Sequence, residues 1–95
     1  MITKQEVEAH LKMVIDPEVG LDIHTMGLIR EINVKDDEHI HIIMTYTTPM
    51  CPAGASIQDA IREAMLNLGV EHVTIEVTFD PPWQMPDALK VMLGF

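Results

Sequence analysis

The chain has 95 residues, of which 15 are Asp or Glu and 6 are Lys or Arg, so its formal net charge is −9 with His neutral. This length predicts a single domain over residues 1–95 with one small core. The acidic balance argues against nucleic-acid binding, and a single cysteine cannot form an intrachain disulfide or a four-thiolate metal site alone. No apolar run is long enough to span a membrane and no secretory leader is recognisable, so we expect a cytoplasmic protein with a reduced thiol.

A first helix is predicted between Thr3 and Pro17. Thr3 and Glu6 have the spacing of a capping box, with Thr3 as the N-cap. Apolar residues then recur on one helical face until Pro17 stops the pattern. The members of this stripe are Val7, Leu11, Val14 and Ile15. We expect residues 16–27 to form a loop with a short extended or helical piece.

Two strands are predicted next, over residues 28–34 and 39–46, joined by a short turn as an antiparallel hairpin. Arg30 interrupts the apolar side of the first strand. Residues 47–54 contain two prolines and a glycine, which is typical of a loop. A second helix over residues 57–68 has the clearest helical spacing of apolar residues, and Gly69 suits its C-terminal end.

A third strand is predicted over residues 73–79, and residues 86–93 indicate a short last helix. The order α-β-β-α-β-α predicts a two-layer α+β sandwich, with a small mixed sheet covered by helices on one face. The other face should be polar, and its members are His39, His41, Thr74, Glu76 and Thr78. His39 and His41 could bind a divalent metal, but no third ligand joins them, so we favour a solvated polar face.

Cys51 lies in the most unusual stretch, just before the second helix. Pro52 suits a first helical turn, so we expect Cys51 to be the N-cap or the residue before it. Free N–H groups and the helix dipole at such a place favour the thiolate, which is both a nucleophile and a soft metal ligand. Thr47 and Thr48 add hydroxyls nearby. The alternative is that Cys51 is a small buried hydrophobic residue, and the residues leave both interpretations open.

Two further segments could contribute side chains to a site. Residues 16–18 (Asp-Pro-Glu) form either a helix terminator with solvated carboxylates, which is favoured on local grounds, or a rigid turn presenting two oxygens toward the Cys51 loop. Residues 80–83 (Asp-Pro-Pro-Trp) end in the single tryptophan, which is either a lid on the core, its commoner use, or an exposed anchor for a partner. The candidate partner-binding residues are Trp83, Asp80 and Met50.

Taken together, these segments resemble the SufT and PaaD family of small domains, also found in the cytosolic iron–sulfur assembly factors of eukaryotes. Four motifs carry the resemblance in the family's order: VIDPEVGLDI (14–23), MGLI (26–29), MTYTTPMCP (44–52) and VTFDPPW (77–83). Leu93-Gly94 follows near the end, so the match covers essentially the whole chain. Met26 stands where the family usually has Leu, and residues 84–87 match weakly.

The resemblance implies an α+β iron–sulfur cluster assembly domain that acts in the maturation of iron–sulfur proteins. In PaaD-type members the role is assembly of the phenylacetyl-CoA oxygenase system. The family's reactive cysteine maps onto Cys51, its acidic turn onto Asp16 and Glu18, and its Thr-rich approach onto Thr47 and Thr48. The implied partners are iron–sulfur assembly proteins and apoprotein clients.

One cysteine per chain cannot hold a cluster that needs four thiolates. A labile cluster at Cys51 would therefore be shared with a second subunit, as in a homodimer, with a partner protein or with a small thiol, and no cofactor is expected to be needed for folding. We favour a non-catalytic assembly role because the chain supplies a metal ligand and no general base. The alternatives are an adaptor that docks clients through Trp83, and a thiol enzyme or redox sensor.

Overall fold

The computed structural model describes residues 2–36, 38–50 and 53–94, and every structural statement below refers to these residues. The elements are α1 (Lys4–Leu11), β1 (Ile29–Val34), β2 (His39–Met44), α2 (Gly54–Leu68), β3 (His72–Val77) and α3 (Asp87–Leu93). Their order confirms the predicted α-β-β-α-β-α arrangement. None of these described helices has the length and apolar character needed to cross a membrane.

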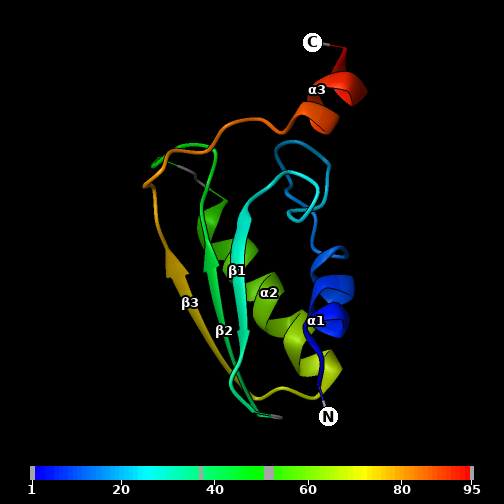
Figure 1. Ribbon diagram of the computed structural model, residues 1–95, viewed down its shortest axis with the longest axis vertical. Helices are drawn as coiled ribbons and strands as arrows, with labels where there is room; N and C mark the ends of the chain where they lie inside the picture. Colours follow the sequence, from blue (N-terminus) through cyan, green and yellow to red (C-terminus); the bar gives the residue numbers. More distant parts are fainter. Residues whose placement is uncertain (1, 37, 51–52, 95) are drawn as a thin grey trace.

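The three strands form one mixed sheet in the order β1-β2-β3 (Figure 1). β1 and β2 pair antiparallel, as the hairpin pattern predicts, whereas β2 and β3 run parallel and are joined through α2. Ile32, Ile42 and Ile75 lie side by side across the sheet in this register. The register of β1 shifts between Ile29 and Glu31, so Arg30 sits in a β-bulge.

α1 begins as predicted and ends early. The Thr3 side chain accepts a hydrogen bond from the Glu6 N–H, and the reciprocal half of the capping box is present. The helix ends at Leu11, not near Pro17 as expected. The core still receives Val14, but through a bent chain held by the Ile23 N–H to Val14 C=O hydrogen bond (2.9 Å), and Ile15 is 51% exposed. The apolar spacing therefore predicts too long a helix, because a loop can bury Val14 as well as a further helical turn would.

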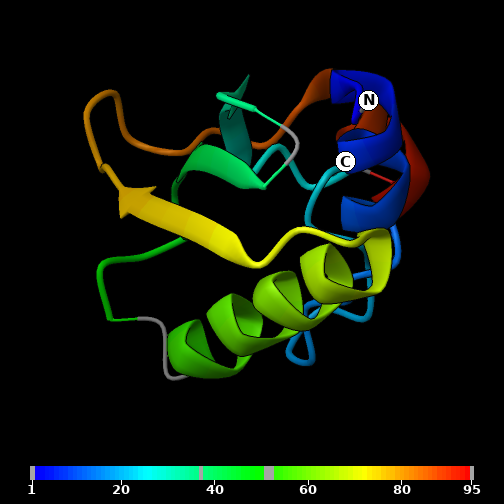
Figure 2. The same ribbon diagram turned by 90° about the horizontal axis from the view of Figure 1, so that it is seen from below.

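α1 and α2 pack together on one face of the sheet, and the core lies between them and the strands (Figures 1 and 2). α2 contributes Ile57, Ile61 and Met65, and it ends at Gly69 in the left-handed conformation (φ 100°), as predicted. α3 differs from the expectation that the helices share one face. It lies beyond the end of the sheet and is fixed there by the buried Leu89.

The uncovered face of the sheet is polar, which confirms the sequence-based expectation. His41 and Thr74 are hydrogen-bonded (Nδ1 to Oγ1, 2.7 Å), and Glu76 Oε1 lies 3.8 Å from His41 Nε2. His39 Nε2 is 3.4 Å from the same Thr74 hydroxyl. Among the described residues no group of three or more His, Cys, Asp or Glu side chains could hold a metal ion.

Candidate functional site

Three loops that carry the sequence motifs meet at one end of the sheet, where β2 and β3 end and β1 begins (Figure 1). They are residues 12–28, the described part of residues 45–53 (45–50 and 53), and residues 78–86. The Thr45 N–H donates to the Leu28 carbonyl (2.8 Å), and the Thr78 N–H donates to the Met44 carbonyl (2.9 Å). These backbone hydrogen bonds hold the starts of two loops against the end of the sheet, so motifs far apart in sequence share one region.

The loop after β2 is tied at both of its ends by Tyr46. The buried Tyr46 hydroxyl donates to the Gly54 carbonyl (3.1 Å) and accepts from Gln58 Nε2 (2.8 Å). Gly54 packs directly on the ring, since a Cβ at this position would lie 3.2 Å from Tyr46 Cζ. The sequence patterns do not indicate this role of the single tyrosine. Its signal was an aromatic residue with a polar end at the close of an apolar strand.

Cys51 itself, with Pro52, lies outside the described residues. The described part of the loop corrects one expectation, because the N-cap of α2 is Ala53 and the helix begins at Gly54. Cys51 is therefore two residues before the N-cap in the sequence, and Pro52 precedes the first turn. The N-cap side chain accepts no hydrogen bond, so the first N–H groups of α2 do not donate to the N-cap residue.

The other predicted residues of this loop are accessible. Met50 is 85% exposed, so it does not belong to the core. The exposed Thr48 accepts a hydrogen bond from the Met50 N–H (Oγ1 to N, 3.1 Å), so its hydroxyl shapes the loop. Thr47 is half-buried, and its hydroxyl makes no hydrogen bond with any described residue. The loop thus combines fixed ends with an exposed middle.

Asp16 is buried (3% exposed), so it is not the solvated carboxylate that local reasoning favoured. Its Oδ1 accepts from the Glu18 N–H (2.8 Å), and its carbonyl accepts from the Gly20 N–H (2.8 Å). Asp16 therefore holds its own turn, because a buried carboxylate needs donors and this turn supplies them. Glu18 is exposed. No hydrogen bond or ion pair joins either residue to residues 47–50.

Asp22 is a second carboxylate that organises this loop, and the sequence analysis did not single it out. Its Oδ2 accepts from the Thr25 N–H (2.8 Å). Burial raises the pKa of the Asp22 carboxyl, but hydrogen bonds from Thr25 and the charge of His24 outweigh it and hold the pKa below 3.8. The available signal was Asp followed three residues later by Thr, the spacing of a local cap.

Trp83 acts as a lid on the core. Its Nε1 donates to the Met26 carbonyl (2.7 Å), and the half-buried ring packs against the core cluster. Gly27 lies beneath it with φ 77°, and a Cβ there would be 3.0 Å from Pro86 Cγ. This contact links the loop before β1 to the start of α3. Asp80 is exposed, and its N–H donates to the Thr78 hydroxyl (3.3 Å).

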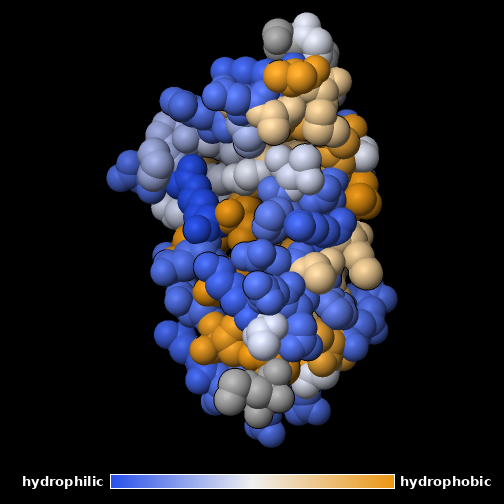
Figure 3. Space-filling view, turned by 45° about the vertical axis from the view of Figure 1, so that its right-hand side comes forward, coloured by the Kyte–Doolittle hydropathy of each residue, from blue (hydrophilic) through white to orange (hydrophobic). Residues whose placement is uncertain are grey.

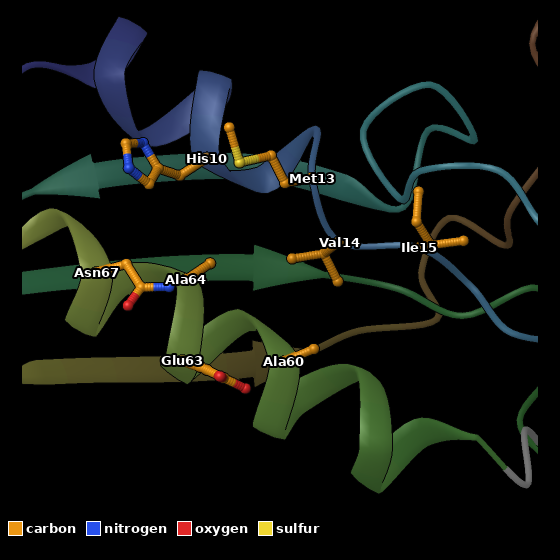
Figure 4. Close-up of a pocket in the computed structure, with 8 residues that line it drawn as sticks. All are labelled: His10, Met13, Val14, Ile15, Ala60, Glu63, Ala64 and Asn67. Atoms are coloured by element: carbon orange, nitrogen blue, oxygen red, sulfur yellow. The ribbon is translucent and has the colours of Figure 1, made fainter.

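A groove of about 370 Å³ lies on the helical side of the molecule, away from the loops that carry the Thr and Trp motifs (Figure 4). Small side chains of α2, Ala60 and Ala64, face Val14 and the exposed Met13 across it. The remaining lining residues are His10, Ile15, Glu63 and Asn67. A second apolar surface covers part of α3, where Val91 and Met92 are exposed (Figure 3).

Comparison with known proteins agrees with this architecture. Residues 4–77 match the family model described as "Iron-sulfur cluster assembly protein". The chain is 33% identical to the Fe-S protein maturation auxiliary factor YitW of Bacillus subtilis, covering 96% of this chain and 93% of that protein. It is 34% identical to the Fe-S protein maturation auxiliary factor SufT of Staphylococcus aureus, covering 86% and 98%. A solved structure from Thermotoga maritima, a conserved hypothetical protein, superimposes with a TM-score of 0.83 at 41% identity, covering 99% and 96%.

Proposed function

The chain belongs to the iron–sulfur cluster assembly protein family, as its resemblance to the SufT and PaaD domains predicted, and from this membership we propose a mechanism for it. Cys51 binds a labile iron–sulfur cluster, or iron, as cargo and hands it to apoprotein clients. Residues 1–95 act as one cytoplasmic domain that carries and transfers without catalysing a reaction. Relatives named as Fe-S protein maturation factors support the role in maturation. Their names say nothing of a thiol, so binding and transfer by Cys51 are the proposed part.

The observation that carries the proposal is the loop between β2 and α2. Its described ends are tied through Tyr46 and Gly54, while Thr48 and Met50 within it are exposed. A ligand that must bind cargo and then release it needs both a defined position and access for a partner. The single thiol of the chain belongs to this segment in the sequence, which supports Cys51 as the ligand.

The donor set limits how cargo can be held. Cysteine thiolate is the preferred protein ligand of iron–sulfur clusters, and this chain has one. The described His, Asp and Glu residues form no group of three that could complete a site. We therefore propose that the remaining ligands come from a second copy of the chain, an assembly partner or a small thiol. Shared ligation also makes the cluster easy to release.

The neighbouring residues are assigned supporting roles. Asp16 holds the turn at residues 16–20 and acts as a positioning residue. Glu18, Thr47 and Thr48 offer oxygen atoms to a partner or to cargo at the same end of the sheet. The dipole at the start of α2, whose N-cap supplies no side-chain acceptor, favours an anionic thiolate near it.

Docking of clients through Trp83 without any cluster has less support. The indole N–H is already used on the Met26 carbonyl, and the ring covers the core. Removing Trp83 would therefore disturb the fold before it removed a contact surface.

Anaerobic reconstitution with ferrous iron, sulfide and glutathione tests the assignment. We expect the wild type to gain bound iron and sulfide together with thiolate-to-iron absorption, and Cys51→Ser to lose both. Met50→Ser is the matched control, because it adds the same side chain next door at an exposed position and should load normally. Iron loading of Cys51→Ser equal to that of the wild type would contradict ligation by Cys51.

A further inference from the structure

β3 forms an outer edge of the sheet, and no other strand of the described residues lies alongside its free side (Figure 1). The His72 N–H donates to the Glu38 carbonyl (3.0 Å) and the Thr78 N–H to the Met44 carbonyl (2.9 Å). In a parallel pair of strands, every second residue directs its backbone N–H and C=O groups toward the neighbouring strand. The even-numbered residues of β3 therefore form hydrogen bonds with β2. The backbone groups of Val73, Ile75 and Val77 point outward, and no described residue pairs with them.

The two edges of this sheet are protected very differently. At the β1 edge the bulge at Arg30 breaks the regular ladder and Lys35 follows the strand, both of which discourage the addition of another strand. β3 pairs with β2 in unbroken register over all six residues and contains no proline, lysine or bulge. An unprotected edge strand rich in β-branched residues is a template on which another strand can pair. Such an edge in a small protein therefore indicates a binding surface for an added strand.

The side chains of β3 specify what such a strand would need. Val73, Ile75 and Val77 are half-buried toward the helices, and an added strand with apolar residues at alternate positions would extend this layer. The opposite face presents His72, Thr74 and Glu76, all exposed. Residues 70–86 contain the acidic side chains of Glu71, Glu76 and Asp80 and no Lys or Arg. The complementary strand alternates apolar and basic residues.

The charge also decides between two occupants. A second copy of the chain would bring another −9 and a second Glu76 to the edge, so two molecules of like charge would repel each other there. A basic segment of another protein gains attraction at the same positions. The hydrogen bonds offered by the edge are the same in both cases, which leaves charge as the discriminating term.

We propose that β3 is a docking edge to which an extended segment of a partner protein, alternating apolar and basic residues, adds as a fourth strand. The inference rests on the proposed function only in taking this partner to be a client or assembly protein. Docking at β3 does not use the thiol, so it holds a client beside the molecule while Cys51 transfers cargo.

A synthetic peptide, acetyl-Thr-Lys-Val-Lys-Val-Lys-Thr-amide, serves as the probe, and amide hydrogen exchange measured by NMR is the readout. In the free protein we expect the amides of Val73, Ile75 and Val77 to exchange fast and those of Thr74 and Glu76 to be protected by β2. The peptide should slow the first three, giving protection along the whole strand. A charge contact without strand pairing would leave the alternation in place.

Matched peptides and variants separate pairing from charge. Two peptides carry N-methyl groups at alternate residues, one at the residues whose N–H groups face β3 and the other at the residues between them. Both keep the charge of the parent peptide. The first should bind at least tenfold more weakly, because its N–H groups can no longer donate to β3. Glu76→Lys should weaken binding at least tenfold, whereas Glu63→Lys, the same change on the exposed surface of α2, should leave it unchanged. Cys51→Ser should bind the peptide as the wild type does.

The proposal is overturned if the peptide leaves the exchange of Val73, Ile75 and Val77 unaltered, or if both N-methylated peptides bind like the parent. Protection of these amides that grows with protein concentration, without peptide, would mean that a second copy occupies the edge. Iron loading by a protein that fails to bind the peptide would remove the docking edge and leave the thiol proposal standing. Peptide binding by a protein that fails to load iron would do the reverse.

Discussion

The loop before β1 and the loop after β2 lie at the same end of the sheet but are built in opposite ways. In residues 12–28 the polar groups are satisfied inside the loop, as at Asp16 and Asp22, and apolar residues such as Ile23 and Met26 are buried. In residues 45–50 only the beginning is buried, and Thr48 and Met50 face solvent. A closed, packed loop suits support, whereas an exposed loop with fixed ends suits binding.

Gly27→Ala tests the packing of the first loop and has the largest expected effect. The new Cβ meets Pro86 at 3.0 Å, and φ is 77°, so strain and a close contact combine. We expect a loss of about 3 kcal/mol in the free energy of unfolding, measured with urea. Gly20→Ala is the control, because φ is 81° but nothing lies within 4 Å. It should cost about 1 kcal/mol. Equal losses would mean that Pro86 does not pack on this loop.

Tyr46→Phe tests how the second loop is tied. The change removes the hydroxyl that bonds the Gly54 carbonyl and Gln58 while keeping the ring in place. We expect the unfolding free energy to fall by about 2 kcal/mol, and amide exchange near Gly54 to rise. Gln58→Met keeps the bond to Gly54 and should cost about 1 kcal/mol or less. A Tyr46→Phe protein as stable as the wild type would show that the tie is not needed.

Asp22→Asn tests the internal hydrogen bonds of the loop before β1 and has the smallest expected effect on the free energy of unfolding. The pKa of Asp22 is lower in the folded chain than its usual 3.8, so the carboxylate stabilises the fold above that pH. The gain is lost as pH falls through the folded-state pKa. The variant should therefore be less stable at neutral pH by under about 1 kcal/mol, and the difference should shrink in urea titrations as pH falls below 3.8. A constant difference at all pH values would rule out the carboxylate as its source.

Most of the fold could be predicted because it follows from local patterns. The capping box at Thr3, the helical spacing before Gly69 and the alternation in three strands each gave the correct element. The end of α1 could not be, since Val14 reaches the core through a loop that mimics helical spacing. α3 was identified as a helix, but its position depends on the contacts of Leu89 at the end of the sheet.

The candidate site was predictable as motifs but not as contacts. Burial of Asp16 depends on donors from its own turn, and the role of Tyr46 depends on Gly54, eight residues away. Neither contact can be predicted from the identity of a single residue. The sequence leaves Trp83 between lid and anchor, and the hydrogen bond to the Met26 carbonyl together with packing of the ring on the core identifies it as a lid. The role of Cys51 stays a prediction that chemistry must test.

Transfer of a cluster to a defined apoprotein tests the central claim most directly. The reconstituted protein is mixed anaerobically with apo-aconitase, and recovery of aconitase activity is followed over time. The wild type should restore activity faster than free iron and sulfide at the same concentration, and Leu66→Ser, a change at an exposed position of α2, should match it. Cys51→Ser, folded as judged by its urea transition, should add nothing to the free-iron rate. Transfer by Cys51→Ser at the wild-type rate would contradict the account.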